Sequence, residues 1–185
     1  MRVVLASASP RRRELLATLI PDFEIAVAGV DEEALTVPDP WETAERLALA
    51  KARAVADQHR DALVIGGDTV VAVDAEQLAK PLDAEDAKRM LRALSGRTHV
   101  VITGVALVGP GREESFTDTT RVTFLPLGEE EIAHSVATGE PMDKAGAYAI
   151  QGGAKAFVTG IEGSWSNVVG LPVEALGERL TIVSS

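Results

Sequence analysis

Residues 3–19, VVLASASPRRRELLATL, show the alternation that decides the fold class. The apolar run 3–6 predicts a buried strand, and residues 11–19 predict a helix that follows it after a polar turn. A chain in which strands and helices alternate in this way is expected to form a sheet covered by helices. The inner face of this first helix should carry Leu15, Leu16 and Leu19.

The clearest helix start in the chain lies at Asp39. Asp39 is placed as the N-cap, Pro40 takes the first helical position, and Glu42 completes a capping box. This helix should run to about Gln58. Later helices are expected at residues 83–94, where Gly96 closes the helix, at 129–136 and at 172–180.

Strand-like segments separate these helices. Residues 62–65 and 70–73 flank the sequence GGDT at 66–69, so we expect strand structure with a special point between the two segments. Residues 99–108 and 116–124 predict a hairpin and therefore a partly antiparallel sheet. The expected fold class is α/β (α+β), with a central twisted mixed sheet flanked by helices. The pattern leaves the strand order open.

Length and composition indicate a single domain that spans residues 1–185. Hydrophobic residues make up 46% of the chain and charged residues 25%, which excludes disorder as the main state. No apolar run approaches the roughly 18–20 residues of a membrane span, and the N-terminal apolar stretch is too short for a signal peptide. Cysteine is absent, which excludes disulfides and thiolate-zinc sites. We expect a cytoplasmic protein with no membrane partner.

The net charge of −10 argues against a nucleic-acid partner. Binding to nucleic acid requires a positive surface that displaces counterions from the phosphates. The two Trp, one Tyr and four Phe residues also leave little material for base stacking. An acidic chain can still bind a phosphorylated small molecule, provided that basic residues gather in a pocket or a cation is bound.

Basic residues gather in the turn 7–13, SASPRRR. Ser9 can cap the following helix, and cations in the first turn oppose the helix dipole at a cost of about 0.3–1 kcal/mol each. Such a helix start suits a bound anion, because backbone N–H and guanidinium groups both bind phosphate. A solvated basic turn explains the pattern equally well. Under either interpretation Arg13 is expected to face solvent.

Lys51 lies on the apolar stripe that Leu47 and Val55 define on the second predicted helix. Helical phase alone favours a side chain that runs outward past its neighbours to solvent. The alternative is a lysine that points into a cleft and contacts an anionic partner there.

Asp68 is an acid within an apolar, strand-like stretch. Burial of a carboxylate is costly unless it is paired or binds a metal, so Asp68 is the leading candidate for chemistry. A structural aspartate that caps a turn is the alternative. Asp31 and Glu32 could bring a second carboxylate, although such an acidic turn is more often solvated surface. Two carboxylates together with substrate phosphates suit Mg²⁺ or Mn²⁺.

Residues 139–153, GEPMDKAGAYAIQGG, have the glycine and charge content of a loop that wraps a ligand. They match no phosphate-binding fingerprint. The Gln151 carboxamide offers a donor and an acceptor, which complement the carbonyl and imino N–H of a uracil or thymine edge. The Gln151 side chain could equally form hydrogen bonds with the backbone of its own loop. Nucleophilic triads and histidine zinc motifs are missing from the chain, and His99 is expected to be structural.

Five segments occur in order along nearly the whole chain: LASASPRRRELL, GGDTVV, AKPLDAEDAKRMLRALSGRTHVVITGV, GEPMDKAGAYAIQGGAKAFV and GSWSNVVGLPVE. Together they resemble the Maf (septum formation) family of nucleoside triphosphate pyrophosphatases. The resemblance implies an inosine-triphosphatase-like fold with two lobes around a central cleft. It also implies a reaction dependent on Mg²⁺ or Mn²⁺ that releases pyrophosphate and leaves the nucleoside monophosphate. Members of the family are often homodimers.

The resemblance assigns roles to individual residues. It makes Asp68 the proton acceptor of the reaction. It places Arg11, Thr69 and Gln151 at the positions that mark the dTTP/UTP branch, so a pyrimidine substrate is favoured. Phosphate or substrate contacts are expected from Ser7, Ser9, Arg12, Lys51, Lys80, Asp143 and Lys144, and metal contacts from Glu32 and Asp68.

These observations lead to one hypothesis and two alternatives. In the hypothesis, Asp68 accepts a proton from the water that attacks the α-phosphorus of dTTP or UTP, and pyrophosphate leaves. In this hypothesis the reaction cleans the nucleotide pool, and the resemblance to the septum formation family adds an expected link to cell-division arrest. One alternative is a nucleotide-binding regulator of septum formation with incidental hydrolysis. The other is a pyrophosphatase for N7-methyl-GTP or damaged purine nucleotides.

Two residues depart from the family pattern. Gly67 stands where alanine is common, and Trp165 stands where tyrosine is usual. Neither is expected to touch the reacting groups, although Trp165 could alter the packing beside the cleft.

Overall fold

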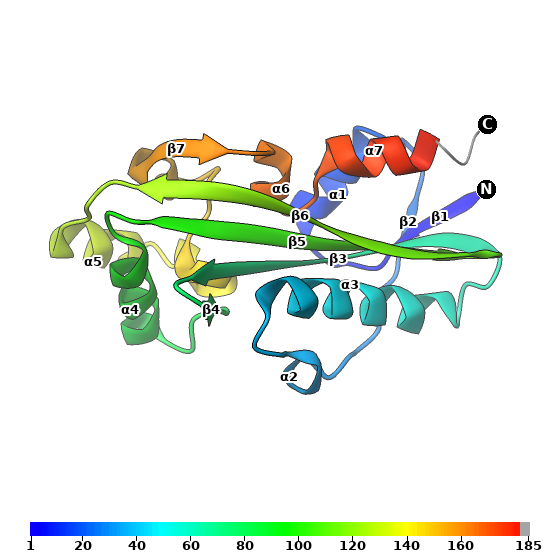
Figure 1. Ribbon diagram of the computed structural model, residues 1–185, viewed down its shortest axis with the longest axis horizontal. Helices are drawn as coiled ribbons and strands as arrows, with labels where there is room; N and C mark the ends of the chain where they lie inside the picture. The colour runs from blue at the N-terminus through cyan, green and yellow to red at the C-terminus, as the bar shows by residue number, and fades with distance from the viewer. Residues whose placement is uncertain (182–185) are drawn as a thin grey trace.

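The computed structural model describes residues 1–181. In this part of the chain a seven-stranded sheet is covered by helices on both faces (Figure 1). The strands are β1 (Arg2–Leu5), β2 (Glu24–Ile25), β3 (Ala62–Val73), β4 (Glu76–Leu78), β5 (Thr98–Gly109), β6 (Arg112–Phe124) and β7 (Val158–Glu162). The α-helices are α1 (Pro10–Ala17), α2 (Glu32–Leu35), α3 (Pro40–Ala56), α4 (Ala84–Leu94), α5 (Glu129–Ala137), α6 (Trp165–Val169) and α7 (Val173–Thr181).

The sheet is mixed, as predicted. Its strand order is β2-β1-β3-β5-β6-β7, and β4 pairs with β3 off this path. β1 runs parallel to β2 and β3, whereas the β3–β5, β5–β6 and β6–β7 pairs are antiparallel. The predicted hairpin is the β5–β6 pair. Figure 1 shows α3 along one face of the sheet and α1, α6 and α7 on the opposite face.

β3 is one continuous strand of 12 residues rather than two segments around a special point. Its side chains alternate between the two faces of the sheet. Val64 packs in the apolar cluster with α3, whereas Leu63 and Ile65 pack in the cluster with α1 and α7. The same alternation places Asp68 on the α3 face and Thr69 on the opposite face.

Two glycines allow α3 to lie close against the sheet. A Cβ built on Gly66 would lie 2.4 Å from the carbonyl oxygen of Ala48, and a Cβ built on Gly104 would lie 2.2 Å from that of Ala44. The helix backbone therefore occupies space that side chains of the sheet would otherwise fill. This close approach brings the middle of α3 within reach of the β3 residues that follow Gly66.

Gly66→Ala is expected to lower the free energy of unfolding by about 1–3 kcal/mol, because the added methyl group overlaps helix backbone. Urea unfolding followed by circular dichroism measures this change. Gly160→Ala is the matched control, since an added Cβ at this strand glycine has no other part of the chain within 4 Å. The control should stay within about 0.5 kcal/mol of the wild type. Equal stability of the two variants would contradict the close approach of α3.

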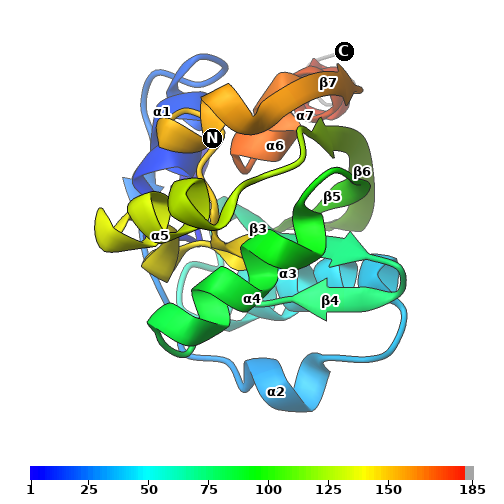
Figure 2. The same ribbon diagram turned by 90° about the vertical axis from the view of Figure 1, so that its left-hand side faces the viewer.

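The long strands β3, β5 and β6 run through both of the expected lobes (Figure 1). In one lobe, Leu16 of α1 and Leu176 of α7 belong to a core cluster with β1, β3 and β5. In the other lobe, Leu94 of α4 and Ile132 of α5 share a second cluster with the far halves of β3, β5 and β6. Figure 2 looks onto this second lobe, which contains α4, α5, β4 and β7.

The cap of α3 differs in one detail from the prediction. Asp39 accepts hydrogen bonds from the backbone N of Trp41 (2.9 Å) and of Glu42 (3.4 Å), so it is the N-cap as expected. The Glu42 carboxylate instead pairs with Arg46 one turn later, so the capping box is not closed.

The elements for which no prediction was made are five residues long or shorter: β2, β4, β7, α2 and α6, together with three short 3-10 helices.

Candidate active site

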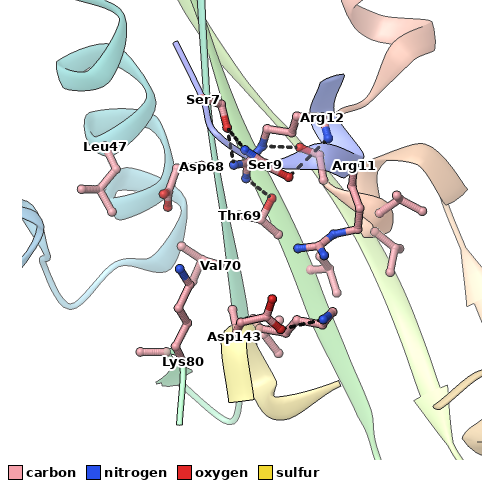
Figure 3. Close-up of a pocket in the computed structure, with 18 of the residues that line it drawn as sticks. Ser7, Ser9, Arg11, Arg12, Leu47, Asp68, Thr69, Val70, Lys80 and Asp143 are labelled. Carbon is pink, nitrogen blue, oxygen red and sulfur yellow. Dashed lines mark hydrogen bonds and ion pairs between the residues drawn. The ribbon is translucent and has the colours of Figure 1, made fainter. Parts of the chain in front are cut away.

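The cleft lies at a gap along the edge of β3. β1 pairs with β3 as far as Leu5 and Ile65, and β4 begins to pair at Val71. Between these points no strand of residues 1–181 lies beside that edge of β3. A cavity of about 740 Å³ opens here (Figure 3). It is lined by every site residue predicted from the sequence: Ser7, Ser9, Arg11, Arg12, Glu32, Lys51, Asp68, Thr69, Lys80, Asp143, Lys144 and Gln151.

On the α3 face of the sheet, Lys51 joins two carboxylates. Its Nζ lies 2.7 Å from Asp68 Oδ1 and 2.7 Å from Glu32 Oε1. The side chains of Lys51 and Asp68 are only 20% and 14% exposed, whereas that of Glu32 is 60% exposed. The expectation that Lys51 runs outward to solvent is therefore wrong, and the cleft alternative is correct. The reason is the close approach of α3 at Gly66, which brings the ammonium group to Asp68.

Burial raises the pKa of Asp68 above its ordinary value, and the charge and hydrogen bond of Lys51 offset only part of this effect. The hydrogen bond from Lys51 lowers the pKa of Glu32. Burial by itself would lower the pKa of Lys51, but its two carboxylate partners outweigh burial and raise it. The site thus combines a charged lysine with a carboxylate of raised proton affinity, which is the property of a general base.

On the opposite face, three protein oxygens hold Arg12. Its guanidinium donates to the carbonyl oxygen of Gly170 (2.8 Å), to Thr69 Oγ1 (2.9 Å) and to Ser7 Oγ (3.4 Å). Burial lowers the pKa of Arg12, and the Asp68 carboxylate opposes this effect. Arg12 therefore ties the turn before α1 to β3 and to the end of α6. Its role as a phosphate ligand stays a prediction.

Ser7 and Ser9 organise the same turn. Ser9 is the N-cap of α1, as predicted, and its side chain accepts a hydrogen bond from Arg12 N (3.3 Å). Ser7 Oγ accepts a hydrogen bond from Ser9 N (3.2 Å). Both hydroxyl groups hold the backbone of the turn at the mouth of the cleft, and their contact with phosphate stays a prediction.

Arg11 and Lys80 are the cations that the cleft leaves free. Neither has a hydrogen bond or an ion pair with any residue in the range 1–181, and both point into the cavity (Figure 3). Arg11 comes from the first turn of α1, and Lys80 follows β4. Arg13 is exposed, as predicted. The free cations flank Asp68 and Thr69 from two sides of the strand, where an anion would meet them.

Residues 139–153 form one wall of the cleft and consist mainly of short 3-10 helices. Lys144 Nζ lies 2.6 Å from Asp143 Oδ1 and donates to the carbonyl oxygen of Glu140 (3.2 Å). Asp143 therefore contacts Lys144 rather than a free cation elsewhere in the cleft. Gln151 is exposed at the end of this wall, where its carboxamide is open to a ligand.

A buried pair that the sequence did not predict anchors this wall. His99 Nε2 lies 2.7 Å from the Tyr148 hydroxyl oxygen, and both side chains are buried. Burial lowers the pKa of His99 to about 4, so its ring is neutral and structural, as predicted. Phe124 packs edge-on against both rings. Because Tyr148 also lines the cleft, this contact fixes the position of the wall.

The two departures from the family pattern have different surroundings. A Cβ on Gly67 would lie 3.1 Å from Arg12 Nε, so glycine leaves room for the guanidinium. Trp165 is 43% exposed and is not among the residues that line the cavity. The side chain of Trp165 therefore does not shape the cleft directly.

The fold and this cleft define a class of protein: an α/β enzyme that acts on a phosphorylated small molecule. Free cations at Arg11 and Lys80 suit phosphate groups, and the buried Asp68 carboxylate in the same cavity has the raised pKa that suits a general base. Local clustering of these cations explains how a chain with a net charge of −10 can bind an anion.

The chain belongs to the Maf-like protein family, whose model matches residues 2–183. A dTTP/UTP pyrophosphatase of Koribacter versatilis is 54% identical over 173 residues, which cover 94% of this chain and 90% of the relative. A dTTP/UTP pyrophosphatase of Myxococcus xanthus is 53% identical over 185 residues, which cover 98% of this chain and 90% of the relative. The resemblance carried by the five sequence segments is thus confirmed.

Solved structures share the fold at low sequence identity. The Ham1 protein of Staphylococcus aureus matches with a TM-score of 0.60, 17% identity and 98% coverage of both chains. A nucleoside-triphosphatase described as a dITP/XTP pyrophosphatase, from Mycobacterium abscessus, matches with a TM-score of 0.51 and 17% identity, covering 100% of this chain and 97% of the other. The inosine-triphosphatase-like fold is confirmed, and a likeness at this identity shows the fold alone.

Proposed function

We propose that this protein hydrolyses dTTP and UTP to the nucleoside monophosphate and pyrophosphate, and so removes these or modified pyrimidine nucleotides from the nucleotide pool. Relatives with about half of their residues identical are named for this activity. The observation that carries the proposal is the placement of Asp68 and Thr69 on opposite sides of the free β3 edge, within one cavity (Figure 3). One side can then hold the reacting phosphate while the other contacts the base.

The α3 side performs the hydrolysis. Lys51 opposes the effect of burial on the pKa of Asp68 and holds the carboxylate in place, and Lys80 supplies a free positive charge for the phosphate chain. Asp68 accepts a proton from the water that attacks the α-phosphorus, and its raised pKa makes it a stronger base. The bond from the α-phosphorus to the bridging oxygen breaks, and pyrophosphate leaves with the electron pair of that bond.

A divalent cation, Mg²⁺ or Mn²⁺, is proposed as the cofactor. Residues 1–181 contain no group of three or more His, Cys, Asp or Glu side chains that could enclose a metal. Asp68 and the exposed Glu32 are a pair of hard carboxylate ligands, which fits a cation that takes its other ligands from phosphate and water. When bound, such a cation neutralises charge on the phosphoryl oxygens.

The opposite side of β3 suits a pyrimidine base. Arg11, Thr69 and Gln151 line it, and the Gln151 carboxamide presents both a donor and an acceptor. A uracil or thymine edge carries the complementary carbonyl and imino N–H groups. The names of the relatives likewise favour dTTP and UTP over N7-methyl-GTP or damaged purine nucleotides.

Product analysis over a panel of nucleotides with Mg²⁺ or Mn²⁺ tests the proposal. We expect pyrophosphate and monophosphate from dTTP and UTP, and little turnover of CTP, ITP, GTP and N7-methyl-GTP. Release of orthophosphate would contradict cleavage at the α-phosphorus, and a preference for the purines would contradict the pyrimidine assignment. Tight nucleotide binding without turnover would support a regulator of septum formation instead.

Four predictions concern features of the protein other than the cleft. The homodimer, the absence of a nucleic-acid partner, the cytoplasmic location and the link to cell-division arrest stay predictions from composition and resemblance. None of the helices within residues 1–181 has the length and apolar character needed to cross a membrane.

A further inference from the structure

A chain of hydrogen bonds leads from the cleft into the protein interior. Arg12 Nη2 lies 2.9 Å from Thr69 Oγ1, which lies 3.0 Å from Thr103 Oγ1. Thr103 Oγ1 in turn lies 3.0 Å from the carbonyl oxygen of Asn167. Thr103 and Asn167 are fully buried, whereas Thr69 lines the cavity. Thr69 and Thr103 are direct partners in the β3–β5 ladder.

The chemistry of the groups fixes the direction of this chain. A guanidinium only donates hydrogen bonds, and a carbonyl oxygen only accepts them. Thr103 must therefore give its single hydroxyl proton to Asn167, and Thr69 must give its own proton to Thr103. In any other arrangement, oxygen lone pairs would face each other at 3.0 Å in a buried position. Thr69 is left with one unused lone pair and no proton for a ligand.

Both ends of the chain are held in place. Arg12 also donates to the carbonyl oxygen of Gly170, at 2.8 Å. The Asn167 side-chain nitrogen donates to the carbonyl oxygen of Val101 (3.1 Å) and to Thr120 Oγ1 (2.9 Å). These contacts hold Arg12 and Asn167 in place, and the acceptor at the Asn167 end is a backbone carbonyl, so no side-chain rotation can reverse the direction of the chain.

We propose that Thr103 is a positioning residue for base selection: it holds the proton of Thr69 away from the ligand, so that Thr69 acts in the cleft only as a hydrogen-bond acceptor. This inference rests on the proposed pyrimidine nucleotide substrate and deepens it. Uracil and thymine carry a single imino N–H at N3, which Thr69 can accept while the Gln151 amide N–H donates to a neighbouring ring carbonyl. Cytosine carries a lone pair at N3, which would face the lone pair of Thr69. The chain therefore selects UTP and dTTP over CTP.

Thr103→Val tests this role, because it removes the hydroxyl with little change in volume. Thr69 then keeps its proton for the ligand and can donate it to N3 of cytosine. The ratio of kcat/KM for UTP to kcat/KM for CTP is expected to fall at least about tenfold. Thr103→Ser restores the hydroxyl and should keep the wild-type ratio.

Thr120→Val is the matched control. It removes another fully buried threonine hydroxyl that contacts Asn167, and it leaves the chain from Arg12 to Thr103 intact. The UTP/CTP ratio should be unchanged in this variant. A ratio that falls equally in Thr120→Val and Thr103→Val would overturn the inference, because general loosening around Asn167 would then explain both.

The substrate preference of the wild-type protein shows whether a negative result contradicts this inference alone or the proposed function as well. If the wild type prefers UTP and Thr103→Val keeps that preference, the inference is wrong and the proposed function stands. If the wild type hydrolyses neither UTP nor dTTP, both are wrong. If Thr103→Val does not fold, wild-type turnover of N3-methyl-UTP decides. Turnover of N3-methyl-UTP that is at least about tenfold below that of UTP supports a hydrogen bond from N3–H to Thr69. Equal turnover of the two nucleotides overturns the inference.

Discussion

Asp68→Asn is expected to lower kcat for UTP about 10²–10⁴-fold, the usual contribution of a general base. Asparagine has nearly the shape of aspartate but cannot accept the proton of the attacking water. Lys51 keeps its contact with Glu32 in this variant, so the cleft should retain its geometry. Steady-state kinetics combined with calorimetric measurement of nucleotide binding would separate a loss of chemistry from a loss of binding.

The thermal stability of Asp68→Asn provides a second readout. Because burial raises the pKa of Asp68 in the folded state, the folded protein binds this proton more tightly than the unfolded chain does. The stability from this group is present at low pH and is lost as pH rises through its folded-state pKa. Above this pKa the ionised carboxylate no longer contributes that stability, and its burial is unfavourable. Asparagine carries no charge, so the Tm of the variant should equal or exceed that of the wild type.

Asp118→Asn is the matched control for both measurements. Asp118 is a partly buried strand carboxylate outside the cleft, and burial raises its pKa as well. Its amide variant should keep full turnover. Substantial residual turnover in a clean preparation of Asp68→Asn would exclude Asp68 as the base.

The parts of the fold that could be predicted from the sequence are those with local signals. The Asp39 cap precedes α3 directly, and the β5–β6 hairpin joins neighbouring segments, so both are visible in a short window of residues. β4 has three residues and exists because it pairs with β3, and α2 has four residues that follow the Asp31 cap. Elements this short carry no periodicity, so nothing in the sequence pattern distinguishes them from loops.

The residues of the site could be named from the sequence, but their contacts could not. Helical phase placed Lys51 on the apolar stripe, yet its direction depends on how near α3 lies to the sheet, which Gly66 decides. The partner of Arg12 at Gly170 lies 158 positions along the chain, and Thr103 lies 34 positions from Thr69. Such contacts depend on strand order, which the pattern left open.

Lys51→Met is expected to lower kcat/KM for UTP about 10²-fold at neutral pH and to move the acid limb of its pH profile to higher pH. Lys51 is the cation that opposes the effect of burial on Asp68. Without it the pKa of Asp68 rises further, so a smaller fraction of the carboxylate is ionised at neutral pH. Turnover should return in part as pH is raised, whereas Asp68→Asn should stay inactive at every pH.

Two further lysine variants make this pH profile decisive. Lys51→Arg keeps the positive charge and should hold the acid limb near its wild-type position. Lys88→Met removes a lysine that pairs with Glu85 on α4, outside the cleft, and should leave the profile unchanged. If Lys51→Met loses turnover while its acid limb stays at the wild-type position, Lys51 acts on the phosphate chain rather than on Asp68. An acid limb at higher pH, with turnover that returns at alkaline pH, would instead establish that the ion pair with Lys51 lowers the pKa of Asp68.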